Sequence, residues 1–149
     1  MATEKLIRKL NELKSDIGEY YLPRYAPCTD EQIAQVKNEI KRDLECDADD
    51  GYLSLLKQLN GFTCNGHMIY PGIGSEYNKS LTAMNLIWSD GLPEIPASYL
   101  VFGESALDFY VRDAATGTYK VMYRLLDSTY EEFETFDELV CWVIDAAMR

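Results

Sequence analysis

Apolar residues in the first segment of the chain recur at intervals of three or four positions. They are Leu6, Leu10, Leu13 and Ile17. This spacing places them on one face of a helix, with charged residues on the opposite face. We therefore predict an amphipathic helix that ends near Gly18. The next segment, 18–28, contains two prolines and three tyrosines, and we interpret it as an extended connector.

A second amphipathic helix is predicted from Asp30 to Glu45. Thr29 and Gln32 have the spacing of a capping box, in which each side chain bonds a backbone N–H at the helix start. Apolar residues follow at helical spacing: Ile33, Val36, Ile40 and Leu44. The segment 52–60, YLSLLKQLN, is then apolar on nearly all sides, which indicates a third helix that is mostly buried.

Two Asn-Gly pairs follow the third helix. Asn60-Gly61 comes directly after the last helical apolar residue, and both residue types tolerate the left-handed conformation that ends helices. Asn65-Gly66 lies between two short apolar runs, which is the typical pattern of a type I′ hairpin turn. His67 is then expected to be the first residue of the returning strand.

The middle of the chain is predicted to contain a loop and a short helix. Residues 71–79 include a Gly-x-Gly but lack the spacing of a phosphate-binding loop, so we expect a flexible loop. Helical spacing returns at four positions: Leu81, Met84, Asn85 and Trp88. Gly91 and Pro93 are expected to end this helix.

The last third of the chain has the pattern of strands followed by a helix. A short apolar strand is expected at 99–102, ending at Gly103. Strands at 107–113 and 118–125 flank a turn in which Gly117 supplies a left-handed position. Inward positions are expected to alternate along the second of these strands: Tyr119, Val121, Tyr123 and Leu125.

Thr135 and Glu138 make a second capping-box pattern, and apolar residues at helical spacing follow. This final helix is expected to pack on the sheet. Helices at both ends of a mainly antiparallel run of strands define an α+β architecture. A chain of 149 residues fits one domain. Within it, residues 1–27 form the first helix and connector, and residues 28–149 form the core.

Net charge is −11, and the charge is unevenly distributed. Residues 1–42 hold eight Lys/Arg and seven Asp/Glu, whereas residues 43–149 hold six Lys/Arg and eighteen Asp/Glu. A surface this acidic repels phosphate, which argues against direct binding to nucleic acid or to an anionic membrane. It would instead attract a basic protein. Solubility alone is the simpler explanation of the same charge.

Five of the acids fall in the eight residues 43–50, DLECDADD. A calcium loop of the EF-hand type needs glycine at its sixth position and glutamate at its twelfth, and neither Asp43 nor Glu45 as the first position gives that pattern. We predict instead that Asp49 or Asp50 caps the third helix. Capping uses one or two acids, so the run of five remains partly unexplained.

The cysteines and the histidine give little sign of catalysis or metal binding. Cys28, Cys46, Cys64 and Cys141 include no CxxC spacing, and His67 is the only histidine. We expect four free thiols, no metal site and no cofactor. An enzyme that uses Cys64 with His67, or Cys141, is the alternative from another class. No residue pattern supplies an orienting acid or an oxyanion hole for it.

The segment YLSLLKQLNGFTCNGHMIY is similar to the signature of the SUKH superfamily. That superfamily includes the yeast Smi/Knr cell-wall-assembly regulators, Syd and many bacterial immunity proteins. The resemblance covers about residues 28–148 and is nearest to the bacterial YrhA-like branch. A Leu-Pro of the family pattern is replaced here by Ala48-Asp49. The matching positions, all expected to be structural, are Tyr52, Leu55, Leu56, Asn60, Gly61, Asn65, Gly66, Gly103 and Asp108.

The resemblance implies a protein-binding domain without catalytic residues. The start of the chain, MATEKLIRKL, lacks the continuous apolar core of a signal peptide, so we expect the protein in the cytoplasm. The first hypothesis is an immunity protein that binds and neutralises a toxin, such as a nuclease with a basic cleft. The alternative is an intracellular scaffold or regulatory binding module, as the yeast branch implies. The candidate partner-binding residues are the two acidic groups of the second half: Asp43, Glu45, Asp47, Asp49, Asp50, Glu131, Glu132 and Glu134.

Overall fold

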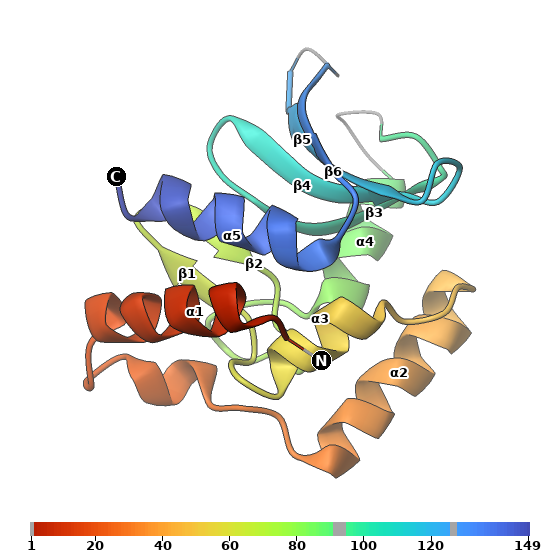
Figure 1. Ribbon diagram of the computed structural model, residues 1–149. Coiled ribbons are helices and arrows are strands. Elements are labelled where there is room, and N and C mark those ends of the chain that lie inside the picture. Colours follow the sequence, from red (N-terminus) through yellow and green to blue (C-terminus); the bar gives the residue numbers. More distant parts are fainter. Residues whose placement is uncertain (1, 91–94, 126–127) are drawn as a thin grey trace.

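A six-stranded antiparallel sheet, with its strands in chain order, organises the structure (Figure 1). The computed structural model describes residues 2–90, 95–125 and 128–149. Each strand pairs with the next along the chain, as expected for successive hairpins. The strands are β1 (Phe62–Cys64), β2 (His67–Ile69), β3 (Tyr99–Glu104), β4 (Asp108–Asp113), β5 (Thr118–Tyr123) and β6 (Thr129–Phe133).

The helices lie before, between and after these strands. They are α1 (Glu4–Ile17), the short 3-10 helix η1 (Leu22–Tyr25), α2 (Asp30–Leu44), α3 (Asp50–Leu56), α4 (Leu81–Ser89) and α5 (Phe136–Ala147). The α+β class, with helices at both ends of an antiparallel sheet, is as predicted. Within the described residues, no helix has the length and apolar composition needed to cross a membrane.

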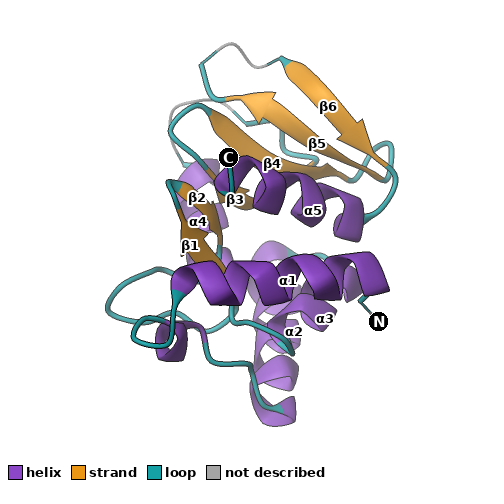
Figure 2. Ribbon diagram, turned by 60° about the vertical axis from the view of Figure 1, so that its left-hand side comes forward, coloured by secondary structure: helices purple, strands orange, loops and turns teal. Residues whose placement is uncertain are grey.

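Two helices cover opposite faces of the sheet. Successive side chains of a strand point to opposite faces. In β4, Tyr110 packs against Trp142 of α5, while Phe109 packs against Trp88 of α4. Helix α1 packs on α5 from outside, and α3 also contacts α5 (Figure 2). Helix α2 contacts α4, so the α2–α3 connection passes near one end of the sheet.

The predicted helix starts are confirmed. Thr29 and Gln32 form the full capping box of α2. The Asp49 side chain accepts the N–H of Tyr52 and caps α3. Thr135 accepts the N–H of Glu138 at the start of α5. The Asn65-Gly66 turn is also confirmed, with positive φ angles at both residues, and His67 begins β2.

Two predictions about the helical half are wrong. The connector is not wholly extended, because η1 forms within it; Pro23 at the start of η1 has the φ angle that a helical turn needs. The third helix ends at Leu56, four residues before Asn60. Asn60 does not end it, and only Gly61 of that pair has a positive φ, of 67°.

The strands also depart from the prediction. β3 continues through Gly103 to Glu104 instead of ending at the glycine. Burial along β5 does not follow the expected alternation: Met122, opposite Phe109 on the face that α4 covers, is buried, whereas Tyr123 at the end of the strand is exposed. Strand β6 was not predicted. The expected helix end at Gly91 and Pro93 lies outside the described residues.

Candidate functional site

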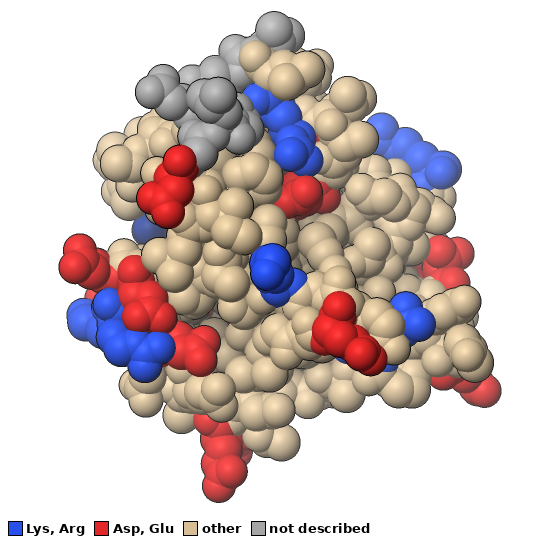
Figure 3. Space-filling model, turned by 180° about the vertical axis from the view of Figure 1, so that it is seen from behind, with Lys and Arg blue, Asp and Glu red and all other residues tan. Residues whose placement is uncertain are grey.

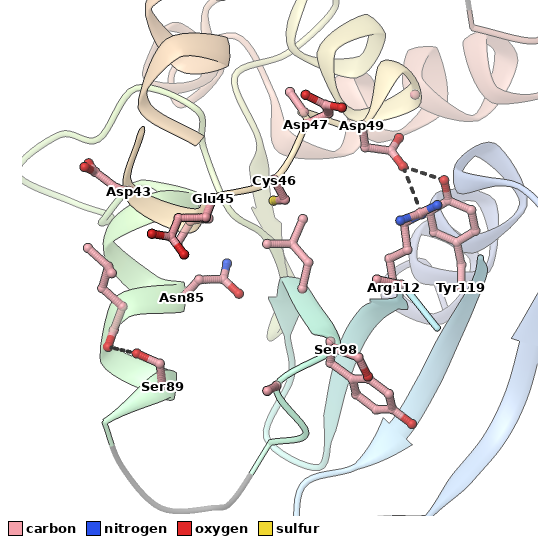
Figure 4. Close-up of a pocket in the computed structure, with 18 of the residues that line it drawn as sticks. Asp43, Glu45, Cys46, Asp47, Asp49, Asn85, Ser89, Ser98, Arg112 and Tyr119 are labelled. Atoms are coloured by element: carbon pink, nitrogen blue, oxygen red, sulfur yellow. Dashed lines mark hydrogen bonds and ion pairs between the residues drawn. The ribbon is translucent and has the colours of Figure 1, made fainter. Parts of the chain in front are cut away.

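The acidic run 43–50 borders a groove of about 850 Å³. One wall is the α2–α3 connection, and α4 contributes Asn85, Leu86 and Ser89. The ends of β3, β4 and β5 close the far side with Tyr99, Arg112 and Tyr119 (Figure 4). The structure therefore brings all five acids of the run to one concave surface. This groove is the candidate site.

Asp49 occupies a structural position at one end of the groove. Its side chain is 10% exposed, caps α3, and accepts a hydrogen bond from the Tyr119 hydroxyl. Arg112 Nε lies 3.8 Å from Asp49 Oδ2 (Figure 4). Burial and the Asp49 carboxylate raise the pKa of Tyr119 to about 12, so its hydroxyl remains a donor at neutral pH. Asp49 thus fixes the groove wall.

Two other acids of the run are paired with nearby cations at the surface. The Arg42 guanidinium donates two hydrogen bonds to the Asp43 carboxylate, at 2.8 and 3.0 Å, and these lower the pKa of the carboxyl. Lys41 Nζ lies 2.9 Å from Asp47 and lowers the pKa of Asp47. Figure 3 shows such mixing of acidic and basic side chains on the face that it views. The run is therefore less negative than its sequence indicates.

Glu45 and Asp50 are the acids of the run that remain for a partner. Both are exposed, and neither forms an ion pair within the residues that the structure describes. Glu45 follows α2 with a left-handed backbone, at φ 56°, which turns the chain toward the groove. Cys46 beside it is half-buried, and burial followed by the Asp47 charge raises the pKa of its thiol.

The second acidic group lies elsewhere. Glu131 and Glu132 are exposed residues of β6, and Glu134 follows that strand. None of these three residues lines the groove. The structure therefore places the two predicted acidic groups on separate surfaces, and β6 had no sequence pattern strong enough to be identified as a strand.

Cys64 and His67 are cross-strand neighbours in the β1–β2 hairpin, yet their side chains have different partners. The Cys64 thiol donates to Asp16, and burial and that bond raise its pKa to about 11. His67 Nδ1 lies 2.5 Å from the Tyr110 hydroxyl, and burial lowers the pKa of the imidazole. A thiol with such a pKa is almost fully protonated at neutral pH and is a poor nucleophile.

The four cysteines are free, and Cys28, Cys64 and Cys141 are buried. Within residues 2–90, 95–125 and 128–149, no three His, Cys, Asp or Glu side chains gather as metal ligands would. The lining of the groove combines the carboxylates of residues 43–50 with the hydroxyls of Ser98 and Tyr119, the amide of Asn85 and some apolar surface. Such a lining suits binding through hydrogen bonds and charge.

The residues of the proposed family signature serve the fold. Tyr52, Leu55 and Leu56 are fully buried, and the Tyr52 hydroxyl donates to the carbonyl of Tyr70. Asn60 connects α3 to the 71–79 loop, since its Nδ2 donates to Ile73 O at 2.9 Å and its Oδ1 accepts the N–H groups of Gly72 and Ile73.

The remaining signature residues support the hairpin and the sheet. Asn65 Nδ2 donates to the carbonyl of Ala147 at the end of α5. Gly66 has a φ of 82° in the turn. A Cβ on Gly61 or on Gly103 would contact β2 backbone, and Asp108 is buried at the start of β4.

Several groove residues could not be assigned from the sequence. Arg112 and Tyr119 come from strands far from the acidic run along the chain, and Ser98 lies in the turn just before β3. The sequence around Arg112 and Tyr119 showed only strand alternation, which does not reveal that these side chains face residues 43–50.

Comparison with protein-family models gives no match. Comparison with curated proteins also gives no match.

The structural role of Asp49 gives a testable prediction. Asp49→Ala is expected to lower the free energy of unfolding by about 2–3 kcal/mol, because it removes a helix cap and leaves the Tyr119 hydroxyl without its acceptor. Urea unfolding measures this change. Asp47→Ala is the matched control, since Asp47 is 89% exposed, and it should leave the unfolding midpoint unchanged. Equal midpoints for the two variants would contradict the assignment.

Proposed function

We propose that the protein is a non-catalytic binding domain that neutralises a basic protein toxin, as an immunity protein does. The observation that carries the proposal is the groove beside residues 43–50, whose free carboxylates are Glu45 and Asp50. The SUKH resemblance supplies the expected role, and the groove supplies a surface suited to it.

Charge favours a basic partner at this surface. Arg112 is the single basic residue among the described residues that line the groove, and it lies beside the Asp49 carboxylate. A basic side chain entering the groove would meet Glu45 and Asp50 without displacing an existing ion pair. Proteins that act on nucleic acid have clefts of positive potential, and an acidic surface can occupy such a cleft.

The net charge of −11 adds long-range attraction to the local contacts. Complementary charge speeds the encounter of two proteins, and salt weakens this effect. A toxin must be captured before it reaches its target, so a fast association rate suits neutralisation. The groove side chains that are already paired, such as Asp49 with Tyr119, keep the surface fixed before the partner arrives.

The double variant Glu45→Gln/Asp50→Asn tests the site. Its association rate with the basic partner is expected to fall about three- to tenfold at low salt, with a smaller salt dependence than wild type. Stopped-flow fluorescence with the purified partner measures both quantities. Glu12→Gln/Glu19→Gln is the matched control, because both residues are exposed near α1, away from the groove lining. An unchanged rate and salt dependence in the groove variant would remove the groove from the interface.

A further inference from the structure

Strand β6 is an open edge of the sheet. It pairs with β5 alone among the strands of the described residues, and Figure 2 shows it at the outer margin of the sheet. Residues 129–132 are all exposed. The outward N–H and C=O groups of an edge strand are free to pair with another extended chain. The other edge, β1, is only three residues long and offers a shorter ladder.

The carboxylates of this edge lack basic partners. Glu131, Glu132 and Glu134 form no ion pair within the part of the chain that the structure describes. Lys120 lies opposite Glu132 in the β5–β6 ladder, but its ammonium contacts Asp113 at 3.1 Å. Glu132 accepts a hydrogen bond from the Thr118 hydroxyl at 2.7 Å, which holds the carboxylate over the neighbouring strand β5. The edge therefore carries uncompensated negative charge.

An aromatic surface adjoins the same edge. The rings of Tyr123 and Tyr130 stack with their centroids 4.4 Å apart. The Tyr130 ring also packs edge to face against the Trp142 ring, with the two centroids 6.0 Å apart. Tyr123 is 38% exposed and Tyr130 is 39% exposed. Partly exposed tyrosines beside a partly buried tryptophan are typical anchors of protein interfaces. They would contact an apolar side chain of a strand that adds to β6.

Charge decides which chain can add to this edge. A second copy pairing through β6 would bring its own glutamates against Glu131 and Glu132, and like charges across a strand pair are destabilising. Because successive residues of a strand point to opposite faces, lysine or arginine at alternating positions of an added strand would instead lie on the face of Glu132, and the residues between them would lie on the face of Tyr130 and Trp142. We propose that the β6 edge binds an extended, basic segment of a protein partner by strand addition. This surface is separate from the groove and does not depend on the function proposed for it.

The test uses the full chain and a synthetic peptide of alternating lysine and valine. Isotope-labelled protein is titrated with the peptide, and amide shifts and amide hydrogen exchange are followed by NMR. The expected result is that shifts centre on residues 129–134 and that β6 amides gain protection from exchange. Glu131→Gln/Glu132→Gln should weaken binding about five- to tenfold. Glu12→Gln/Glu19→Gln should bind as wild type does.

Two control peptides separate strand addition from simple charge attraction. A peptide with glutamate in place of lysine should not bind. A lysine–valine peptide with N-methyl groups on alternate backbone nitrogens keeps its charge but cannot complete the ladder, and it should bind at least about tenfold more weakly. Equal binding of the N-methylated peptide would overturn the proposal, as would shifts centred on residues 43–50. Protection of β6 amides by concentrated protein alone would show self-pairing and would also overturn it.

Discussion

Asn85→Leu is expected to lower the free energy of unfolding by about 3–4 kcal/mol. β2 pairs with β3 at Gly103 and Glu104, and Tyr70, directly after β2, donates its backbone N–H to Phe102 O. The β2–β3 pairing therefore stops before Val101, which has no neighbouring strand on that side within the described residues. The Asn85 amide takes the place of the missing strand. Its Oδ1 accepts Val101 N at 2.8 Å and its Nδ2 donates to Val101 O at 2.8 Å. Leucine would leave two buried backbone groups unpaired, each costing about 1–3 kcal/mol.

Urea unfolding of the purified variant measures the loss, and hydrogen exchange at the Val101 amide locates it. Ser89→Ala is the matched control on the same helix, because Ser89 is exposed and, within the described residues, its hydroxyl bonds only the carbonyl of Leu86. It should change stability by less than about 0.5 kcal/mol. If Asn85→Leu unfolds at the wild-type midpoint, Asn85 does not complete the β3 edge.

Gly103→Ala is expected to cost about 3 kcal/mol or more. A Cβ at this position would lie 2.0 Å from the carbonyl oxygen of Met68 and 3.0 Å from Ile69 Cα. Both contacts are with backbone of β2, so a side-chain rotation cannot relieve them. The two strands would have to separate, breaking the ladder between β2 and β3. Thermal and urea unfolding both report this loss.

Gly66→Ala separates this steric effect from backbone strain. Gly66 has a φ of 82°, and apart from its chain neighbours no atom of the described residues lies within 4 Å of the place that a Cβ would take, so alanine there is strained but not crowded. It is expected to cost about 1–2 kcal/mol. A Gly103→Ala variant no less stable than Gly66→Ala would show that β2 and β3 do not approach this closely.

The sequence predicted the elements whose signals are local. Helix faces, the caps at Thr29, Asp49 and Thr135, and the Asn65-Gly66 turn all depend on residues a few positions apart. These features follow from side-chain periodicity and from backbone preferences of single residues. They were also enough to define the α+β class, because helices at both ends with hairpins between them leave few other arrangements.

Features that depend on distant contacts were not predictable in the same way. Met122 is buried and Tyr123 is exposed, the reverse of a strict alternation, because Met122 lies opposite Phe109 on the face that α4 covers and Tyr123 ends β5. β6 has glutamates at adjacent positions and no apolar face to reveal it. Beyond the capping role expected of Asp49 or Asp50, the sequence did not distinguish the acids of residues 43–50 from one another. Tertiary contacts divide them, since Asp49 bonds Tyr119 from a strand 70 residues away.

The most direct test of the proposed function is affinity capture from the source cell at low and at high salt, followed by mass spectrometry. We expect one stoichiometric partner of basic charge that stays bound at high salt and is toxic when expressed alone. Co-expression of this protein should abolish that toxicity, and Glu45→Gln/Asp50→Asn should restore part of it. A set of substoichiometric partners, lost at moderate salt and without toxicity, would contradict the proposed function and favour a scaffold instead.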